Sequence, residues 1–295
     1  MKILLLGKNG QLGWELQRSL APLGEIISPE RHQGGDLAHT EALVDLALAV
    51  APQVIVNAAA YTAVDRAESE PELAMKINSG SPAALASVAK DLGALMVHYS
   101  SDYVFDGSGH QARDEQAPHG ALSVYGHSKA AAEASIQAIG GRHLILRTSW
   151  VYGARGGNFA KTMLRLAAER DQLQVINDQI GAPTGADLLA DLSAHMIRAT
   201  LQRPQLSGLY NAVASGETSW HGYACHVIDF ARQRGVPLKA TRDQVRALPT
   251  SQYPTPAARP LNSRLDTTKL RQSFGLSLPP WQQGVERMLS EILPT

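Results

Sequence analysis

Three glycines at three-residue spacing, Gly7, Gly10 and Gly13, follow the first apolar run of the chain in the sequence ILLLGKNGQLG. The run before them, Lys2–Leu6, is typical of a buried strand, and Gln11–Leu20 after them has the spacing of an amphipathic helix. Here Gly7 permits a tight turn, Gly10 lets the backbone approach a bound group, and Gly13 allows the helix to pack closely against the strand. Because the N-terminus of a helix favours negative charge, this turn predicts a site for the pyrophosphate of a dinucleotide.

Short apolar runs alternate with helical patterns through the first half of the chain. The expected strands cover Lys2–Leu6, Glu25–Ser28, Val54–Asn57 and Leu95–Ser100, and the expected helices cover Gln11–Leu20, Thr40–Val50 and Glu72–Leu92. This alternation predicts parallel strands joined by crossover helices, and strands that are apolar throughout are typical of a sheet covered on both faces. We therefore expect an α/β fold with a Rossmann-type, doubly wound parallel sheet.

The pattern becomes less regular after Leu146, where stretches rich in Gly, Pro, Asn and Arg predict functional loops. A last amphipathic helix is expected over Trp281–Leu293. We expect a dinucleotide-binding domain over residues 1–150, with 186–235 packing back onto it, and a smaller C-terminal substrate-binding domain formed by 151–185 and 236–295.

Charge and composition narrow the class of ligand. Basic and acidic residues both number 27, so the formal net charge is zero, and the sequence has no long basic run. This balance argues against a nucleic-acid or membrane-surface partner and favours a small molecule. The single cysteine, Cys225, excludes an internal disulfide framework, and the first apolar run is too short for a signal peptide or membrane span. We expect a cytoplasmic protein.

A tyrosine and a lysine four residues apart, Tyr125 and Lys129, lie in the helical stretch SVYGHSKAAAE. Positions i and i+4 share one face of a helix, so the phenol and the ammonium can converge on one oxygen atom. Ser101 and Asp102 end an earlier apolar strand, at the carboxyl edge where open α/β sheets bind ligands.

Reduction of a ketone needs a proton for the developing alkoxide, and a neighbouring ammonium makes a phenol a better proton donor. Alone, Tyr125 and Lys129 could be a solvated helix pair, and Ser101 could be a strand-end cap. Together with the glycine turn, the order strand, Ser, Tyr, Lys predicts a catalytic group.

The glycine spacing G-x-x-G-x-x-G resembles that of the extended short-chain dehydrogenase/reductase superfamily. Eight stretches, among them VIVNAAAYTAVDRAESEPE, VHYSSDYVFDG, VYGHSKAAAE and YPTPAARPLNSRLDT, resemble the dTDP-4-dehydrorhamnose reductase family and span nearly the whole chain. The resemblance implies an NADPH- or NADH-dependent oxidoreductase that reduces the 4-keto group of dTDP-4-dehydro-6-deoxy-L-mannose to dTDP-L-rhamnose, for cell-surface polysaccharides. It also implies a homodimer.

The resemblance also implies roles for particular residues. Tyr125 matches the proton donor, Lys129 its partner, and Ser101 a catalytic position usually filled by threonine. The expected cofactor contacts are Gly7, Gly10, Gln11, Leu12, Gly13, Glu30, Arg31, Asp36, Leu37, Ala60, Tyr61, Thr62, Tyr99, Tyr125 and Lys129. The expected contacts to the dTDP-sugar are Thr62, Val64, Ser101, Asp102, Tyr125, Trp150 and Arg259.

Several of these assignments have alternatives. Glu30 suits NADH, whereas the adjacent Arg31 could pair with the 2′-phosphate of NADPH. Trp150 follows a strand and could be a core residue, and Arg259, whose guanidinium suits a diphosphate, could be an ordinary surface arginine. Some members of the family place magnesium at a dimer contact, through acidic residues that match Glu15, Asp187 and Glu291, although the middle residue departs from the family's glutamate.

Two other functions stay open. The first is another nucleotide-sugar reductase or epimerase of the superfamily, and the second is a non-catalytic regulatory subunit that binds NADP. A dehydratase is disfavoured because Tyr103, rather than a second carboxylate, follows Asp102.

Overall fold

A parallel sheet of six strands forms the first part of the computed structural model, which describes residues 1–293. Its strand order is β10-β5-β4-β3-β1-β2, and every neighbouring pair is parallel. The strands are β1 (Lys2–Leu6), β2 (Glu25–Ile27), β3 (Val54–Asn57), β4 (Leu95–Ser101), β5 (His143–Thr148) and β10 (Gly208–Asn211). The predicted Rossmann-type sheet is confirmed.

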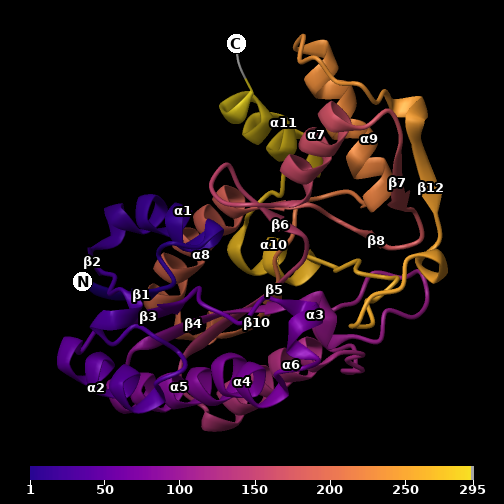
Figure 1. Ribbon diagram of the computed structural model, residues 1–295. Helices are drawn as coiled ribbons and strands as arrows, with labels where there is room; N and C mark the ends of the chain where they lie inside the picture. The colour runs from indigo at the N-terminus through magenta and orange to yellow at the C-terminus, as the bar shows by residue number, and fades with distance from the viewer. Residues whose placement is uncertain (294–295) are drawn as a thin grey trace.

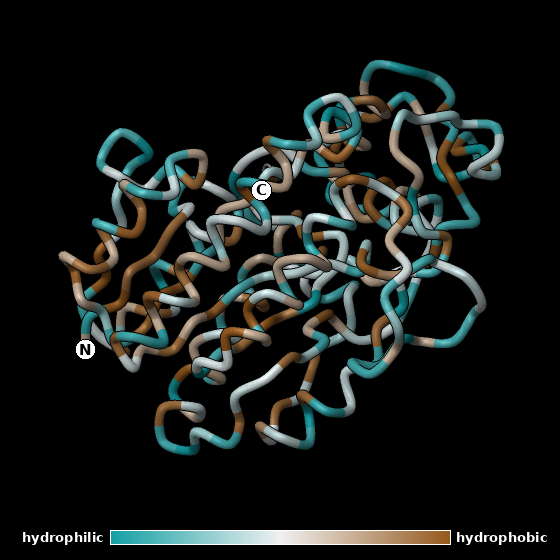
Figure 2. Tube along the Cα trace, turned by 90° about the horizontal axis from the view of Figure 1, so that it is seen from below, coloured by the Kyte–Doolittle hydropathy of each residue, from teal (hydrophilic) through white to brown (hydrophobic). Residues whose placement is uncertain are grey.

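Helices cover both faces of this sheet (Figure 1). One face packs against α1 (Gln11–Leu20) and α8 (Ala186–Gln202), and the other against α2 (Thr40–Val50), α5 (Ser81–Asp91) and α6 (Val124–Ile139). Successive side chains of a strand point to opposite faces of the sheet, so each strand contributes to the apolar core on both faces. In β4, Val97 packs in the core on the α1 and α8 face, and Met96 packs in the core on the opposite face. In Figure 2 the apolar strands appear as brown segments within the molecule, and hydrophilic turns lie at its outside.

The helix expected over Glu72–Leu92 is divided. The chain forms the short helices α3 (Val64–Ala67) and α4 (Pro71–Met75), then a π-helical turn over Lys76–Gly80, and then α5. The π-helical turn contains Asn78, which accepts a hydrogen bond from Tyr61 N at 2.7 Å and donates one to Tyr61 O at 3.0 Å. This long-range contact explains a distortion that the local apolar pattern does not predict.

The smaller part of the fold has its own apolar cluster. It is built from α7 (Phe159–Glu169), α9 (Trp220–Gln233), α11 (Trp281–Ile292) and the parallel pair β7 (Leu173–Ile176) and β12 (Val245–Leu248). The remaining strands are β6 (Val151–Tyr152), β8 (Ile180–Gly181), β9 (Thr184–Gly185) and β11 (Thr218–Ser219), and the remaining α-helix is α10 (Thr268–Phe274).

Residues 186–235, which the sequence predicts to pack onto the first domain, divide between the two parts of the fold. Helix α8 and strand β10 lie with the large sheet, but α9 packs with α7 and α11 because its apolar face, including Tyr223 and Val227, completes the smaller cluster. Within residues 1–293, no helix is both long enough and apolar enough to span a bilayer.

Candidate active site

The glycine turn lies between β1 and α1, as predicted. Gly7 has a φ of 87°, a backbone conformation that favours glycine. A Cβ on Gly13 would lie 2.0 Å from the carbonyl oxygen of Gly7, so the helix packs on the turn with no room for a side chain. Gly10 is the N-cap of α1, and no side chain caps this helix start. The first N–H groups of α1 can therefore bind an anion such as a pyrophosphate.

The residues after β2 contact this turn. The Glu30 carboxylate accepts a hydrogen bond from Asn9 at 2.9 Å and pairs with Lys8 at 2.9 Å. The hydrogen bond from Lys8 lowers the pKa of Glu30, so this side chain is an anion beside the glycine turn. The neighbouring Arg31 is exposed. The structure thus presents both a carboxylate and a guanidinium at the place where a cofactor ribose is expected.

Other predicted cofactor residues already have partners. Asp36 Oδ1 accepts from Ala38 N at 3.0 Å, and the Tyr99 hydroxyl shares a hydrogen bond with Ser193 at 2.7 Å. Tyr99 therefore faces α8, across the sheet from α6. Among the other predicted cofactor contacts, Leu37 is buried. The rest are half-buried or exposed and lie around the glycine turn and after β3: Gln11, Leu12, Ala60, Tyr61 and Thr62.

Ser101, Tyr125 and Lys129 come together where β4 meets α6. The helix begins after Ser123, whose hydroxyl accepts a hydrogen bond from Gly126 N at 3.2 Å. Tyr125 consequently lies in the first turn, and Lys129 follows one turn later. Ser101 lies close enough to Tyr125 to lower the pKa of the phenol. The structure therefore places Ser101 near Tyr125 and places Lys129 one turn further along the same helix; their catalytic roles stay a prediction.

Burial governs the electrostatics of this group. Burial raises the pKa of Tyr125 to about 12, the negative charge of Asp102 adds to the rise, and the hydrogen bond with Ser101 opposes it. Burial also lowers the pKa of Lys129 to about 8, against the attraction of Glu133. Tyr125 thus keeps its proton at neutral pH and can donate it, while Lys129 can change its protonation state.

Asp102 lies directly beside the catalytic group. It is 1% exposed, and its Oδ1 accepts a hydrogen bond from the Ser101 hydroxyl at 2.9 Å. Its Oδ2 is buried and has no hydrogen-bond partner among residues 1–293. Burial raises the pKa of Asp102 to about 6, although hydrogen bonds from Ser263 and Ser101 oppose the rise. A buried carboxylate oxygen without a partner is suited to a hydroxyl group of a ligand.

Trp150 was expected to be a sugar contact or a core residue, and Arg259 a diphosphate contact or a surface arginine. The structure shows features of both alternatives for each residue. Trp150 has a φ of 50°, a strained value for a bulky residue, and stacks on Trp220 with ring centres 3.7 Å apart. Arg259 binds both carboxylate oxygens of Asp65, at 2.9 and 2.8 Å. The Arg259 fork therefore ties the C-terminal segment to α3, next to Val64, and must leave Asp65 before it can bind a diphosphate in full.

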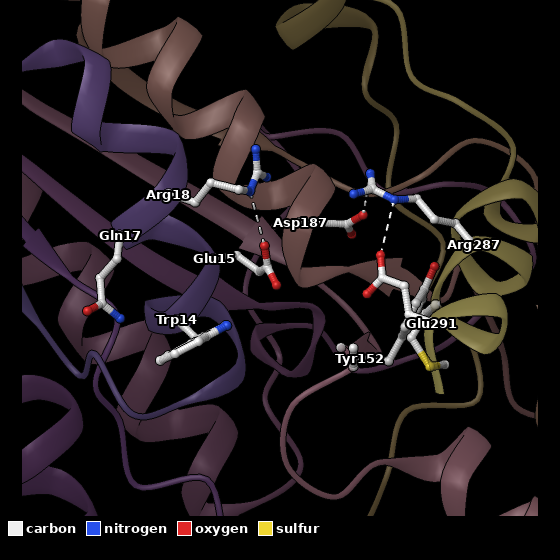
Figure 3. Close-up of a pocket in the computed structure, with 11 residues that line it drawn as sticks. Trp14, Glu15, Gln17, Arg18, Tyr152, Asp187, Arg287 and Glu291 are labelled. Carbon is white, nitrogen blue, oxygen red and sulfur yellow. Dashed lines mark hydrogen bonds and ion pairs between the residues drawn. The ribbon is translucent and has the colours of Figure 1, made fainter. Parts of the chain in front are cut away.

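The three carboxylates of the predicted magnesium site line one pocket of about 390 Å³ (Figure 3). Each carboxylate pairs with an arginine: Arg18 pairs with Glu15 at 3.4 Å, and Arg287 pairs with Asp187 at 3.1 Å and with Glu291 at 3.5 Å. Within residues 1–293 of one chain, no group of three His, Cys, Asp or Glu side chains could hold a metal ion. The magnesium site expected at a contact between two chains stays a prediction.

Two buried residues of the site are absent from the predicted set. His98 Nε2 lies 3.3 Å from Lys129 Nζ, and Ser263 lies close enough to Asp102 to oppose the rise of its pKa. A polar residue inside an otherwise apolar strand was the available signal for His98. No local signal identifies Ser263, because the chain brings it to Asp102 from far along the sequence.

Comparison with known proteins gives one consistent match. Residues 1–293 match the family model described as the RmlD substrate binding domain. The dTDP-4-dehydrorhamnose reductases of Escherichia coli strain K12 and Salmonella typhimurium strain LT2 are 53% and 54% identical to the chain, over 100% of it and 99% of each relative.

Solved structures agree with this match. The dTDP-4-dehydrorhamnose reductase from Bacillus anthracis strain Ames, in complex with NADP, has a TM-score of 0.89 at 33% identity, covering 98% of this chain and 99% of that one. A UDP-glucose 4-epimerase from Thermus thermophilus, in complex with NAD, has a TM-score of 0.79 at 19% identity, covering 99% of each chain, and shares the fold alone.

Proposed function

The chain belongs to the dTDP-4-dehydrorhamnose reductase family, and from this premise we propose how its residues carry out NADPH-dependent reduction in dTDP-rhamnose synthesis. The substrate is dTDP-4-dehydro-6-deoxy-L-mannose and the product is dTDP-L-rhamnose. The bound nicotinamide supplies the hydride that reduces the 4-keto carbon. Tyr125 gives its hydroxyl proton to the oxygen that becomes the 4-hydroxyl group.

The placement of Tyr125 is the observation that carries this proposal. Ser101, at the carboxyl end of β4, lies close enough to lower the pKa of the Tyr125 phenol, and Lys129 follows one turn along the same face of α6. The glycine turn at the end of β1 lies two strands away in the same sheet edge. A cofactor bound across this edge would bring its reactive end to the phenol.

Lys129 makes the phenol a usable acid. A pKa of about 12 favours the neutral phenol, so loss of the proton must be assisted when the alkoxide forms. The Lys129 ammonium, in a buried setting, stabilises the phenolate that remains. Return of a proton from solvent then restores Tyr125 for the next turnover.

The dTDP-sugar is proposed to lie between the two parts of the fold. Asp102 Oδ2 would accept a hydrogen bond from a sugar hydroxyl, and Trp150 would flank the ring. Thr62 and Val64, at the start of α3, line the same region, and Arg259 would bind the diphosphate after releasing Asp65. Glu30 and Arg31 contact the cofactor ribose, with Arg31 favouring NADPH.

Turnover of a Tyr125→Phe variant tests the proposed function. The assay follows NADPH oxidation in the presence of the 4-keto sugar, generated in situ. We expect kcat to fall about 10²–10⁴-fold, the usual size of a general-acid contribution. Tyr210→Phe is the matched control, because the Tyr210 hydroxyl donates to Leu206 O at an edge strand of the sheet. A Tyr125→Phe variant as fast as wild type would exclude Tyr125 as the donor.

The same assay separates the alternatives. An epimerase would retain nicotinamide through gel filtration and would not consume added NADPH. A regulatory subunit would bind NADPH without oxidising it.

We also propose a cytoplasmic homodimer with magnesium at the dimer contact, as the family resemblance implies. The carboxylates of Glu15, Asp187 and Glu291, which line the pocket of Figure 3, would first have to leave their arginine partners. Sedimentation equilibrium with EDTA or with added magnesium tests the dimer and its metal: a monomer under both conditions would contradict the homodimer, and a dimer that EDTA does not weaken would contradict the metal.

A further inference from the structure

On the sheet side, Lys129 contacts His98, which in turn contacts Asn57. Its Nζ lies 3.3 Å from His98 Nε2, and His98 Nδ1 lies 3.3 Å from the amide nitrogen of Asn57. Asn57 and His98 are register partners on β3 and β4, so their side chains emerge on the same face of the sheet, toward α6. All three residues are at most 2% exposed.

The Asn57 amide fixes which atom of the His98 ring carries the proton. Ala59 N donates to Asn57 Oδ1 at 3.2 Å, so the opposite end of the amide, Nδ2, faces His98. An amide nitrogen only donates, and His98 Nδ1 must therefore accept. Burial and the nearby Lys129 keep the pKa of His98 well below its usual range, so the ring is neutral. Its single proton then lies on Nε2 and points at Lys129 Nζ.

We propose that His98, oriented by Asn57, is a positioning residue that holds the Lys129 amino group on the sheet side of α6 and favours its free-amine form over the ammonium form. The geometric reason is that a ring N–H directed at Nζ bonds to a lone pair, which only the amine has. The inference rests on the proposed function, because Lys129 matters through its action on Tyr125.

The other ionisable groups around Lys129 do not replace this contact. Tyr125 and Glu133 lie one turn before and one turn after it on α6. Glu133 favours the ammonium form, but its carboxylate is already held by Arg147 at 2.6 Å and by His119 at 2.9 Å. His98 is thus the polar neighbour on the sheet side that favours the amine.

Titration of lysine side-chain nitrogens by NMR tests the inference directly, in cofactor-free protein labelled with ¹⁵N-lysine. We expect Lys129, assigned with a Lys129→Arg variant, to titrate near its pKa of about 8 in the wild type. In His98→Gln the carboxamide oxygen can accept from the ammonium, so the midpoint should rise by roughly one pH unit. His127→Gln is the control, because His127 is exposed on α6 and should leave the midpoint unchanged. An unchanged or lower midpoint in His98→Gln would overturn the proposal.

Steady-state kinetics then show whether His98 acts by positioning Lys129 or only by filling space in the core. His98→Leu removes every polar contact, and kcat should fall at least about tenfold with KM for the sugar nearly unchanged. His98→Gln should recover most of kcat and shift the alkaline limb of the pH profile upward with the NMR midpoint. Equal activity losses in both variants, matched by equal falls in Tm, would show a structural role only. If the wild type does not reduce the keto sugar, the proposed function fails, while the NMR midpoints still decide this inference.

Discussion

Gly13→Ala perturbs the glycine turn at the point where the structure leaves no room. A Cβ on Gly13 would lie 2.0 Å from the carbonyl oxygen of Gly7 and 2.6 Å from its carbonyl carbon. Ordinary van der Waals contact begins near 3.4 Å. The start of α1 must therefore move away from the turn by more than one ångström, because both contacts are backbone atoms that cannot rotate aside.

The energetic consequences differ for stability and for cofactor binding. Alanine gains about 1 kcal/mol over glycine in a helix, whereas overpacking costs about 1–3 kcal/mol, so we expect a net loss of up to about 2 kcal/mol. At about 2.1 cal/mol/K of unfolding entropy per residue, this lowers Tm by roughly 3 °C. Displacement of the α1 N–H groups removes at least one hydrogen bond to phosphate. A charge-assisted bond is worth about 1.5–3 kcal/mol, which predicts a roughly 10–100-fold rise in the Kd for NADPH.

Fluorescence titration with NADPH and thermal unfolding measure the two effects separately. Gly80→Ala is the matched control, because Gly80 also has helical backbone angles but has nothing within 4 Å of an added Cβ. We expect the Gly80→Ala variant to bind NADPH as the wild type does. Unchanged NADPH affinity and Tm in Gly13→Ala would refute the claim that this close approach forms the cofactor site.

Three further predictions concern charge. The rate of reduction should fall as pH rises through about 8, because Lys129 then loses the proton with which it stabilises the phenolate; a pH profile of kcat that is flat from about 7 to 9.5 would contradict this. Arg147→Met should cost about 3–5 kcal/mol in urea unfolding, because it leaves the buried Glu133 carboxylate without its main partner, whereas Arg66→Met, in an exposed ion pair, should cost less than about 1 kcal/mol. Arg31→Ala should weaken NADPH roughly tenfold or more while leaving NADH affinity nearly unchanged, and equal effects on both cofactors would remove Arg31 from the 2′-phosphate site.

Local patterns predict the elements that depend on local interactions. The bounds of β1, α1, α2 and β3 agree with the sequence prediction, because a continuous apolar run or a helical period is enough to define each. The Tyr125–Lys129 pair was likewise predictable, since the spacing i and i+4 fixes a common helix face.

Contacts between distant residues explain what the sequence could not predict. The π-helical turn at Asn78 depends on Tyr61, and the orientation of Arg259 depends on Asp65, 194 residues earlier. His98 on β4 contacts Lys129 only because α6 packs over the sheet, and it lies beside Asn57 only because β3 pairs with β4. Such contacts leave no periodic pattern in the chain. Residue type alone pointed to Arg259 without indicating its partner, and it gave no reason to single out Asn78.

Helix α6 shows how stability and catalysis depend on the same packing. Its residues at i, i+4 and i+8 face polar groups of the sheet, in the pairs Tyr125 with Ser101, Lys129 with His98, and Glu133 with Ser100. A buried polar row on a helix is costly unless each member has a partner. The Glu133 ion pair with Arg147 joins the far end of this row to β5. We therefore expect the position of Tyr125 to depend on an ion pair two turns away, so that loss of the pair should lower turnover as well as stability.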